Sequence, residues 1–275
     1  MSDLGKMDYI FITLKAYSIP GLVNEISTMF KENTAVITAY NGIPWWYFFN
    51  IEGSFKNYRI KCIDPKNIQW NVITPERIIG CVVYPATEII EPGVIKHIEG
   101  NRFSLGEPNG AQTERISRIS KAMARADLKA PVRKNIRQEI WMKLIGNLAF
   151  NPLSVITGET LDVLTSKKEN KEIAYAAMQE ASLIMDKLEI PLNISIDQRI
   201  KGAAKVGAHK TSMLQDYEKG IMIMEDFGDL TFYKVLVKKK NKLSIYKKLV
   251  DLLLKIQKIK PKKKLRTIFI KSHTV

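Results

Sequence analysis

The sequence contains few of the residues that build disulfide frameworks and metal sites. Its 275 residues include two cysteines, Cys62 and Cys81, three histidines and no C-x-x-C pair. This scarcity excludes a disulfide scaffold and predicts that the protein binds no metal, zinc included. We therefore interpret both cysteines as ordinary core or surface thiols.

Long apolar runs are also missing. The run at residues 9–14 is far shorter than the roughly 18 residues that a membrane span requires, and no signal peptide is recognisable. Apolar residues nevertheless make up 45% of the chain, which is enough for a sizeable core, and 275 residues exceed the usual size of one domain. The expectation is a soluble, cytoplasmic protein of two domains without a membrane partner.

Acidic residues are nearly absent from the end of the chain. Residues 230–275 include 14 lysines, one arginine and one aspartate, and therefore carry +14 of the total net charge of +15. The rest of the chain is almost neutral. This distribution argues against a nucleic-acid-binding domain, which would combine basic residues with placed aromatics in a recognisable fold. A basic tail that binds polyanions in a salt-dependent way is the alternative.

Apolar periodicity divides the chain into a strand-rich first part and a helical second part. Residues 8–14 and 35–38 are predicted strands, and Pro20 opens a helical pattern between them that continues to Phe30. Further strands, at the edge of a mixed sheet, are predicted at 78–84, 93–99 and 103–105. Helices are predicted at 112–124, 136–148, 174–188 and 194–206, with an extended piece at 129–133. The predicted fold class is therefore α/β.

Residues 45–49 form an aromatic cluster, Trp-Trp-Tyr-Phe-Phe, after the turn Asn41-Gly42-Ile43-Pro44. Such rings could pack over a pocket. We favour the interpretation that they form a hydrophobic plug between the domains.

Lys143, Asn147 and Asn151 recur every four residues within an otherwise apolar segment. On a helix they lie along one stripe, and a cation with two carboxamides can donate to a small oxyanionic substrate. Burial without partners would cost about 1–3 kcal/mol for each group, so a polar partner is expected opposite them. A solvated or structurally bonded stripe is the alternative. Pro152, which follows Asn151, is expected to interrupt or bend the helix.

This segment resembles the substrate-domain signature of the ketopantoate reductase family, because it reads W-x-K-x3-N-x3-N-P-L and is followed by Thr157-Gly158. The resemblance extends over roughly residues 4–220. Its other elements, in the family's order and approximate spacing, are Lys15 after the first strand, Asn41-Gly42, E-P-G-V-I-K-H at 91–97, and S-M-L-Q-D at 212–216.

The resemblance implies a fold and an activity. The implied fold is a partial Rossmann-like domain at residues 1–110 and an all-helical substrate domain at 111–228, similar to the C-terminal domain of 6-phosphogluconate dehydrogenase. Residues 229–275 would be a divergent basic tail. The implied activity is NADPH-dependent reduction of 2-dehydropantoate (ketopantoate) to pantoate in pantothenate and coenzyme A biosynthesis. The chain could also form a homodimer.

Site residues follow from the same resemblance. Lys143 would act as the general acid, and Asn147, Asn151 and Ser212 would bind the 2-keto acid. Residues on the cofactor side would be Lys15, Asn41 and Glu225, the last about one residue out of register with the family's acidic residue. Ser212 could instead cap a helix that begins at Met213, and Asn41 could be a left-handed turn residue.

One element of the family is not found. The printed sequence contains no G-x-G-x-x-G turn, the motif that brings backbone N–H groups to a cofactor pyrophosphate. Because the resemblance also fades after Ile221, we expect a truncated or impaired copy of the reductase. A reductase of another branched 2-keto acid and a non-catalytic remnant that only packs or dimerises are the alternatives.

Overall fold

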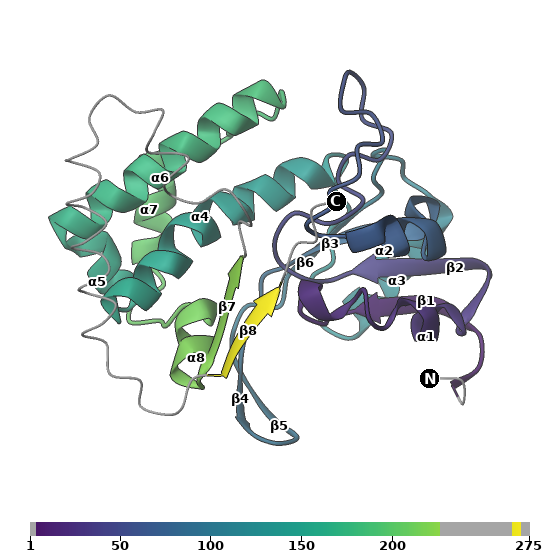
Figure 1. The fold of residues 1–275 in the computed structure, drawn as a ribbon, viewed down its shortest axis with the longest axis horizontal. Coiled ribbons are helices and arrows are strands. Elements are labelled where there is room, and N and C mark those ends of the chain that lie inside the picture. The colour runs from purple at the N-terminus through teal and green to yellow at the C-terminus, as the bar shows by residue number, and fades with distance from the viewer. Residues whose placement is uncertain (1–3, 226–265, 271–275) are drawn as a thin grey trace. The chain divides into compact units, whose positions relative to one another are not determined.

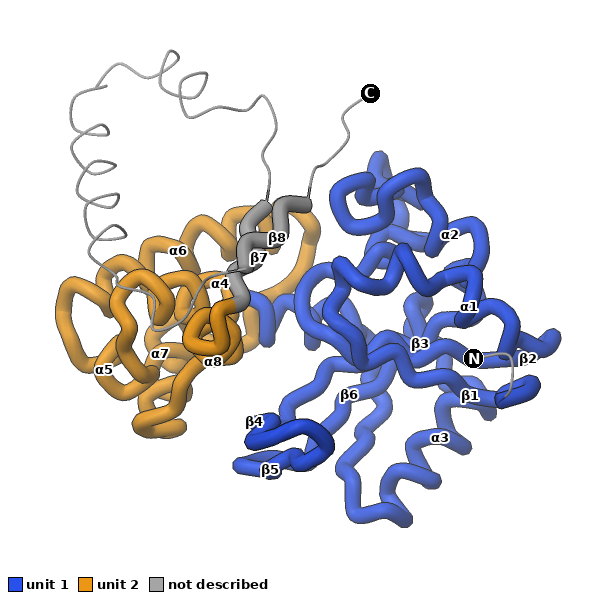
Figure 2. Tube along the Cα trace, turned by 60° about the horizontal axis from the view of Figure 1, so that its bottom comes forward, with its two compact units in different colours: residues 1–144 blue, residues 145–275 orange. Residues whose placement is uncertain are grey.

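The computed structural model describes residues 4–225 and 266–270, and the side chains of residues 221–225 and 266–270 lie outside this description. The chain forms two compact units, Met1–Leu144 and Ile145–Val275 (Figure 2). This division differs from the expected boundary after residue 110. The difference arises because the helix that follows residue 110 packs on the sheet of the first unit.

The first unit is built on a four-stranded mixed sheet (Figure 1). Its strands follow the order β1 (Met7–Ile12), β2 (Phe30–Thr38), β3 (Ile78–Val83) and β6 (Phe103–Gly106). The first three strands are parallel, and β6 pairs antiparallel with β3, so that Val83 lies opposite Phe103. The mixed sheet and the strands predicted at 8–14, 35–38, 78–84 and 103–105 are confirmed, whereas the strand predicted at 93–99 does not belong to this sheet.

The helices between these strands are short. Between β1 and β2 the chain forms a 3-10 turn, Ala16–Ser18, and α1 (Val23–Ser27), so the predicted helix ends before Phe30, which instead begins β2. The hydroxyl groups of Ser27 and Thr28 donate to carbonyl oxygens one turn earlier in the helix. Such local bonds compete with helix propagation. Between β2 and β3 lie a second short helix and two 3-10 turns, α2 (Ile68–Val72), Pro65–Asn67 and Pro75–Arg77.

Both faces of the sheet are covered, because apolar side chains alternate along the central strands. On β2, Val36 belongs to one apolar cluster, whereas Ala35 and Ile37 belong to the other. The second cluster is completed by α3 (Glu114–Arg125), which buries Ile116, Ile119 and Met123. Thr113 caps this helix by accepting from the Ile116 N–H.

The aromatic cluster at residues 45–49 lies in the first unit. Trp45 and Trp46 are 1% and 0% exposed and belong to its apolar core. The Trp46 indole N–H donates to the hydroxyl of Thr38, and that of Trp141 donates to Tyr47. The interpretation as a plug between domains was therefore wrong, since rings with these partners are integral to one core.

A separate hairpin joins β3 to β6. It consists of β4 (Ala86–Glu91) and β5 (Val94–Glu99), of which only β5 was predicted. Gly93 supplies the left-handed turn, with φ of 84°. Ile89 and Ile95 pair across the two strands and are 61% and 68% exposed.

The second unit is mainly helical. Helix α4 (Ile136–Thr157) begins in the first unit, continues through Pro152 without interruption, and ends where Gly158 adopts φ of 73°. Of the two effects expected of Pro152, an interruption of the helix is therefore wrong, and a bend stays a prediction. Further helices are α5 (Leu161–Ser166), α6 (Lys168–Lys187), α7 (Ile196–Ala204) and α8 (Ser212–Glu218). None of the helices in the described residues is both long and apolar enough to cross a membrane.

Only part of the expected basic tail is described. Within it, β8 (Arg266–Ile270) pairs in parallel with β7 (Ile221–Glu225). The remainder of the predicted tail, residues 229–265 and 271–275, lies outside the described residues.

Candidate active site

The carboxyl ends of the parallel strands bring two of the predicted site residues to one edge of the sheet. Lys15 follows β1 and Asn41 follows β2, and both side chains are exposed. At this edge, the Ala39 N–H after β2 donates a hydrogen bond to the carbonyl of Ile12 at the end of β1. In open α/β sheets, ligands bind outside this edge. The left-handed residue of the turn is Gly42, with φ of 95°, so the alternative reading of Asn41 as the left-handed residue was wrong.

Lys143 lies at the same edge, on the part of α4 that belongs to the first unit. Its ammonium donates to the carbonyl of Val83, the last residue of β3, and lies 5.5 Å from the centre of the Tyr84 ring. The side chain is half-buried. A cation is therefore held where the third parallel strand ends, beside the strand ends that precede Lys15 and Asn41.

Four residues around Lys143 form a polar network that sequence reasoning missed. The Tyr84 hydroxyl donates to Oε2 of Glu139 over 3.0 Å, and Oε1 of Glu139 lies 3.1 Å from Nε of Arg133. The Arg102 guanidinium lies 3.8 Å from the centre of the Tyr84 ring. Only the four-residue spacing of Glu139 and Lys143 was visible in the sequence.

Burial changes the acidity of two groups near Lys143. Burial, followed by the nearby Glu139 carboxylate, raises the pKa of Tyr84. Burial raises the pKa of Cys81 on β3 to about 12, although the Lys143 ammonium opposes this shift. Both groups are therefore neutral under ordinary conditions, and Tyr84 acts as a hydrogen-bond donor.

The two asparagines occupy the continuation of the same helix in the second unit. Asn147 and Asn151 lie one and two turns after Lys143, and both are half-buried. The predicted stripe is therefore present on one helix. Within the described residues, neither carboxamide forms a hydrogen bond that would occupy it, which leaves both able to donate and accept.

Ser212 is the first residue of α8 and is exposed. The N-cap of this helix is Thr211, whose side chain accepts from the Leu214 N–H. Reading Ser212 as a helix cap was therefore wrong. Its hydroxyl is not required for capping, because Thr211 already accepts from the first turn.

Glu225 is the last residue of β7. Its backbone pairs with Ile270, and its side chain lies outside the described part of the chain.

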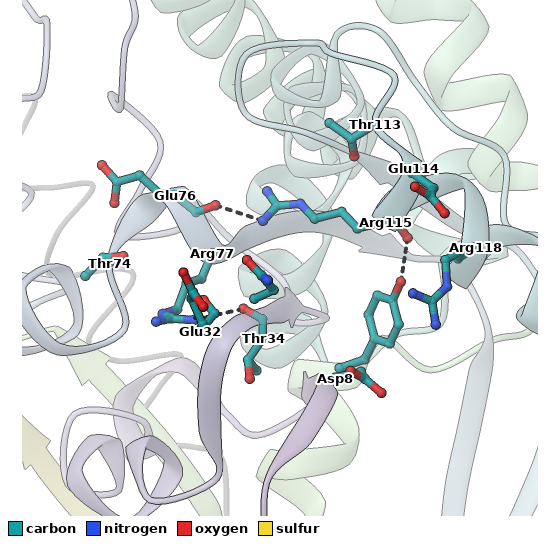
Figure 3. A pocket seen from close by; sticks show the side chains of 12 residues that line it. Asp8, Glu32, Thr34, Thr74, Glu76, Arg77, Thr113, Glu114, Arg115 and Arg118 are labelled. Carbon is teal, nitrogen blue, oxygen red and sulfur yellow. Dashed lines mark hydrogen bonds between the residues drawn. The ribbon is translucent and has the colours of Figure 1, made fainter.

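A hollow of about 550 Å³ opens at the opposite, amino end of the parallel strands (Figure 3). Asp8 of β1, Arg77 before β3 and Arg115 of α3 are among its lining residues. Arg77 donates to the carbonyls of Lys31, Glu32 and Thr34, and Arg115 donates to both oxygens of Glu107. Because these guanidinium groups are used within the fold, we place the candidate site at the carboxyl edge instead.

Comparison with known proteins identifies the family of this chain. The family model described as ketopantoate reductase PanE/ApbA matches residues 1–110, and the one described as ketopantoate reductase PanE/ApbA C terminal matches residues 135–225. A 2-dehydropantoate 2-reductase of Mesorhizobium japonicum is 46% identical over 218 residues, which are 79% of this chain and 67% of that protein.

Solved structures show the same fold. A structure described as a candidate ketopantoate reductase from Ralstonia solanacearum MolK2 is 34% identical, with a TM-score of 0.75, over 78% of this chain and 66% of the other. D-mandelate dehydrogenase with NADH and anilino(oxo)acetate is 17% identical, with a TM-score of 0.66, over 79% and 65% of the two chains. The chain thus spans about two thirds of the length of these relatives. On the two family models and the 46% identical relative, this chain belongs to the ketopantoate reductase family.

Proposed function

We propose that this chain carries the catalytic lysine and the substrate-binding residues of an NADPH-dependent reductase that converts ketopantoate to pantoate. The observation that carries the proposal is the position of Lys143, whose ammonium is held at the carboxyl end of β3 and is followed on α4 by Asn147 and Asn151. The Mesorhizobium relative, named 2-dehydropantoate 2-reductase, supports this choice of substrate.

The residues present fit the nicotinamide end of such a cofactor. Lys15 and Asn41 are exposed at the carboxyl edge of the parallel strands, where either can donate to a ribose hydroxyl. The printed sequence contains no Gly-rich turn, so no residue is assigned to the pyrophosphate. When bound, the reduced nicotinamide supplies a hydride to the ketone carbon.

The residues of the chain bind the keto acid, stabilise the charge that develops on it and supply a proton. Reduction places negative charge on the ketone oxygen, and the Lys143 ammonium stabilises that charge and donates a proton to the oxygen. Asn147 and Asn151 donate to and accept from a substrate that carries a carboxylate and a hydroxyl. Ser212 donates to the carboxylate.

The proposal includes a homodimer. Helix α6 buries one stripe of apolar residues and exposes another set, with Ile173, Leu183 and Ile184 at 56%, 63% and 52% exposure. Three large apolar side chains exposed on one helix support burial against a second copy. Light scattering of the purified chain should give twice the monomer mass.

The decisive test measures oxidation of NADPH by the chain with a panel of branched 2-keto acids, alongside direct binding of NADPH, NADH and ketopantoate. We expect oxidation that depends on ketopantoate and is faster with NADPH than with NADH. If the chain reduces another branched 2-keto acid but not ketopantoate, the proposed substrate is wrong, and the proposed reaction, reduction of a 2-keto acid, stands. Failure to bind any 2-keto acid would overturn the proposal.

A further inference from the structure

Arg102 lies at the carboxyl end of β3, because it immediately precedes β6, which runs antiparallel to that strand. Its backbone is fixed there, since its carbonyl accepts from the Tyr84 N–H over 3.0 Å. Its guanidinium lies over the Tyr84 ring, with Cζ 3.8 Å from the ring centre, and the residue is half-buried. A second cation is therefore held at the edge of the sheet where the candidate site lies.

The guanidinium of Arg102 differs from two others in the first unit in the acceptors that it meets. Arg115 donates to both oxygens of Glu107, and Arg137 donates to three backbone carbonyls. Among the described residues, no carboxylate lies within ion-pair distance of Arg102, and its polar side-chain contacts are with the ring and the hydroxyl of Tyr84. A guanidinium carries several N–H donors, more than one hydroxyl can satisfy. Arg102 thus has donors to offer to an anion.

Arg102 and Lys143 lie beside the same ring. The Lys143 ammonium is 5.5 Å from the centre of the Tyr84 ring and donates to the carbonyl of Val83, the preceding residue. Both cations belong to the first unit. A 2-keto acid carries its carboxylate on the carbon next to the ketone carbon, so the groups that recognise these two functions have to lie near each other. The planar fork of an arginine matches the two oxygens of a carboxylate, whereas an ammonium acts as a point charge.

We propose that Arg102 is a further substrate-binding residue, whose guanidinium binds the carboxylate of the 2-keto acid while Lys143 acts on the ketone oxygen. The inference rests on the proposed function for the identity of the acid. Because every 2-keto acid carries this carboxylate, Arg102 selects acids over neutral ketones and does not distinguish one branched side chain from another.

The test is isothermal titration calorimetry of the full chain with ketopantoate, in the presence of NADP⁺ and in its absence. Arg102→Gln should weaken the binding of ketopantoate by about ten- to a hundredfold, because it removes hydrogen bonds between charged groups. The lactone of ketopantoate, in which the carboxylate is esterified, should bind the parent and this variant equally. Arg125→Gln, at an exposed arginine that ends α3, is the matched control and should bind ketopantoate like the parent.

Kinetics provide the second measurement. Arg102→Gln should raise KM for ketopantoate by the same factor and leave kcat nearly unchanged, since the carboxylate is bound alike in the ground state and the transition state. Arg102→Lys keeps the charge without the fork and should show a smaller loss of affinity. It decides the question if Arg102→Gln does not fold, because parental affinity for ketopantoate in Arg102→Lys would then contradict the proposal.

Three results would overturn the inference: unchanged binding of ketopantoate by Arg102→Gln, an equal loss for ketopantoate and its lactone, and a loss of affinity for NADPH alone. The last result would assign the guanidinium to a cofactor phosphate. If the parent binds ketopantoate but does not reduce it, the proposed function fails, while the affinities still decide the role of Arg102. If the parent binds no 2-keto acid, both fail.

Discussion

The hydroxyl oxygens of Ser154 and Thr211 lie 2.5 Å apart in the interior of the second unit. Ser154 is 0% exposed and lies one turn after Asn151 on α4, whereas Thr211 is 5% exposed and caps α8 immediately before Ser212. The bond therefore fixes the start of α8 beside the asparagine-bearing turn of α4. Two predicted substrate residues are thus held near each other by hydroxyl groups that would not touch the substrate.

Thr211→Val should lower the free energy of unfolding by about 1–3 kcal/mol, because it removes the helix cap and one partner of a buried hydrogen bond. Urea denaturation measures the change. Ser166→Ala, at an exposed serine that ends α5, is the control and should stay within about 0.5 kcal/mol of the parent. Equal effects of the two substitutions would show that the bond does not stabilise the unit.

Lys143→Ala should reduce kcat for the keto acid by about 10²–10⁴, the usual contribution of a general acid, while the affinity for NADPH changes little. Steady-state kinetics and a fluorescence titration with NADPH separate the two quantities. Lys121→Ala, at an exposed lysine on α3, is the matched control. Full turnover in Lys143→Ala would remove this residue from the mechanism.

Glu107→Gln should destabilise the first unit by about 1–3 kcal/mol, because the buried side chain at position 107 loses the charge that accepts two hydrogen bonds from the partly exposed Arg115 guanidinium. Glu107 is 3% exposed, and its hydrogen bonds hold the pKa of Arg115 above its usual value. Thermal unfolding reports the change. Asp8→Asn breaks the exposed ion pair with Lys31 at the same hollow and should have no measurable effect.

Two glycine-to-alanine substitutions should change the free energy of unfolding in opposite directions. A Cβ at Gly80 on β3 would lie 2.7 Å from the Trp46 ring, so Gly80→Ala should cost about 1–3 kcal/mol through overpacking. A Cβ at Gly202 on α7 would meet no atom within 4 Å, and Gly202→Ala should stabilise that helix by about 0.5–1 kcal/mol. A neutral Gly80→Ala in chemical denaturation would contradict the tight packing of this strand against Trp46.

The two thiols should react at different rates. Cys62 is exposed, whereas Cys81 is 4% exposed with its pKa raised to about 12 by burial, so the nucleophilic thiolate of Cys81 is scarce until the unit unfolds. A chromogenic disulfide reagent should titrate one thiol in the native chain and both in urea. Cys62→Ser should abolish the native reaction; a remaining native reaction would show that Cys81 is accessible.

Local patterns explain most of what could be read from the sequence. The strands at β1, β2 and β3 followed from short apolar runs, and the four-residue spacing of Lys143, Asn147 and Asn151 placed them on one helix. The ends of elements were less predictable. Helix α4 continues through Pro152 because proline removes one donor and kinks a helix without forcing it to end. Strand β4 was not predicted, and its apolar residues are exposed.

The sequence by itself determined the α/β class, the family and the helical stripe, because each depends on residue types at fixed, short separations. Only the tertiary structure decided which groups meet. Val83 and Lys143 are 60 residues apart, and Tyr84 and Glu139 are 55 apart. Such contacts depend on how the strand and helix pack after the chain has folded, and no local period encodes them. For the same reason, the environment of Lys143 became visible only when β3 and α4 were brought together.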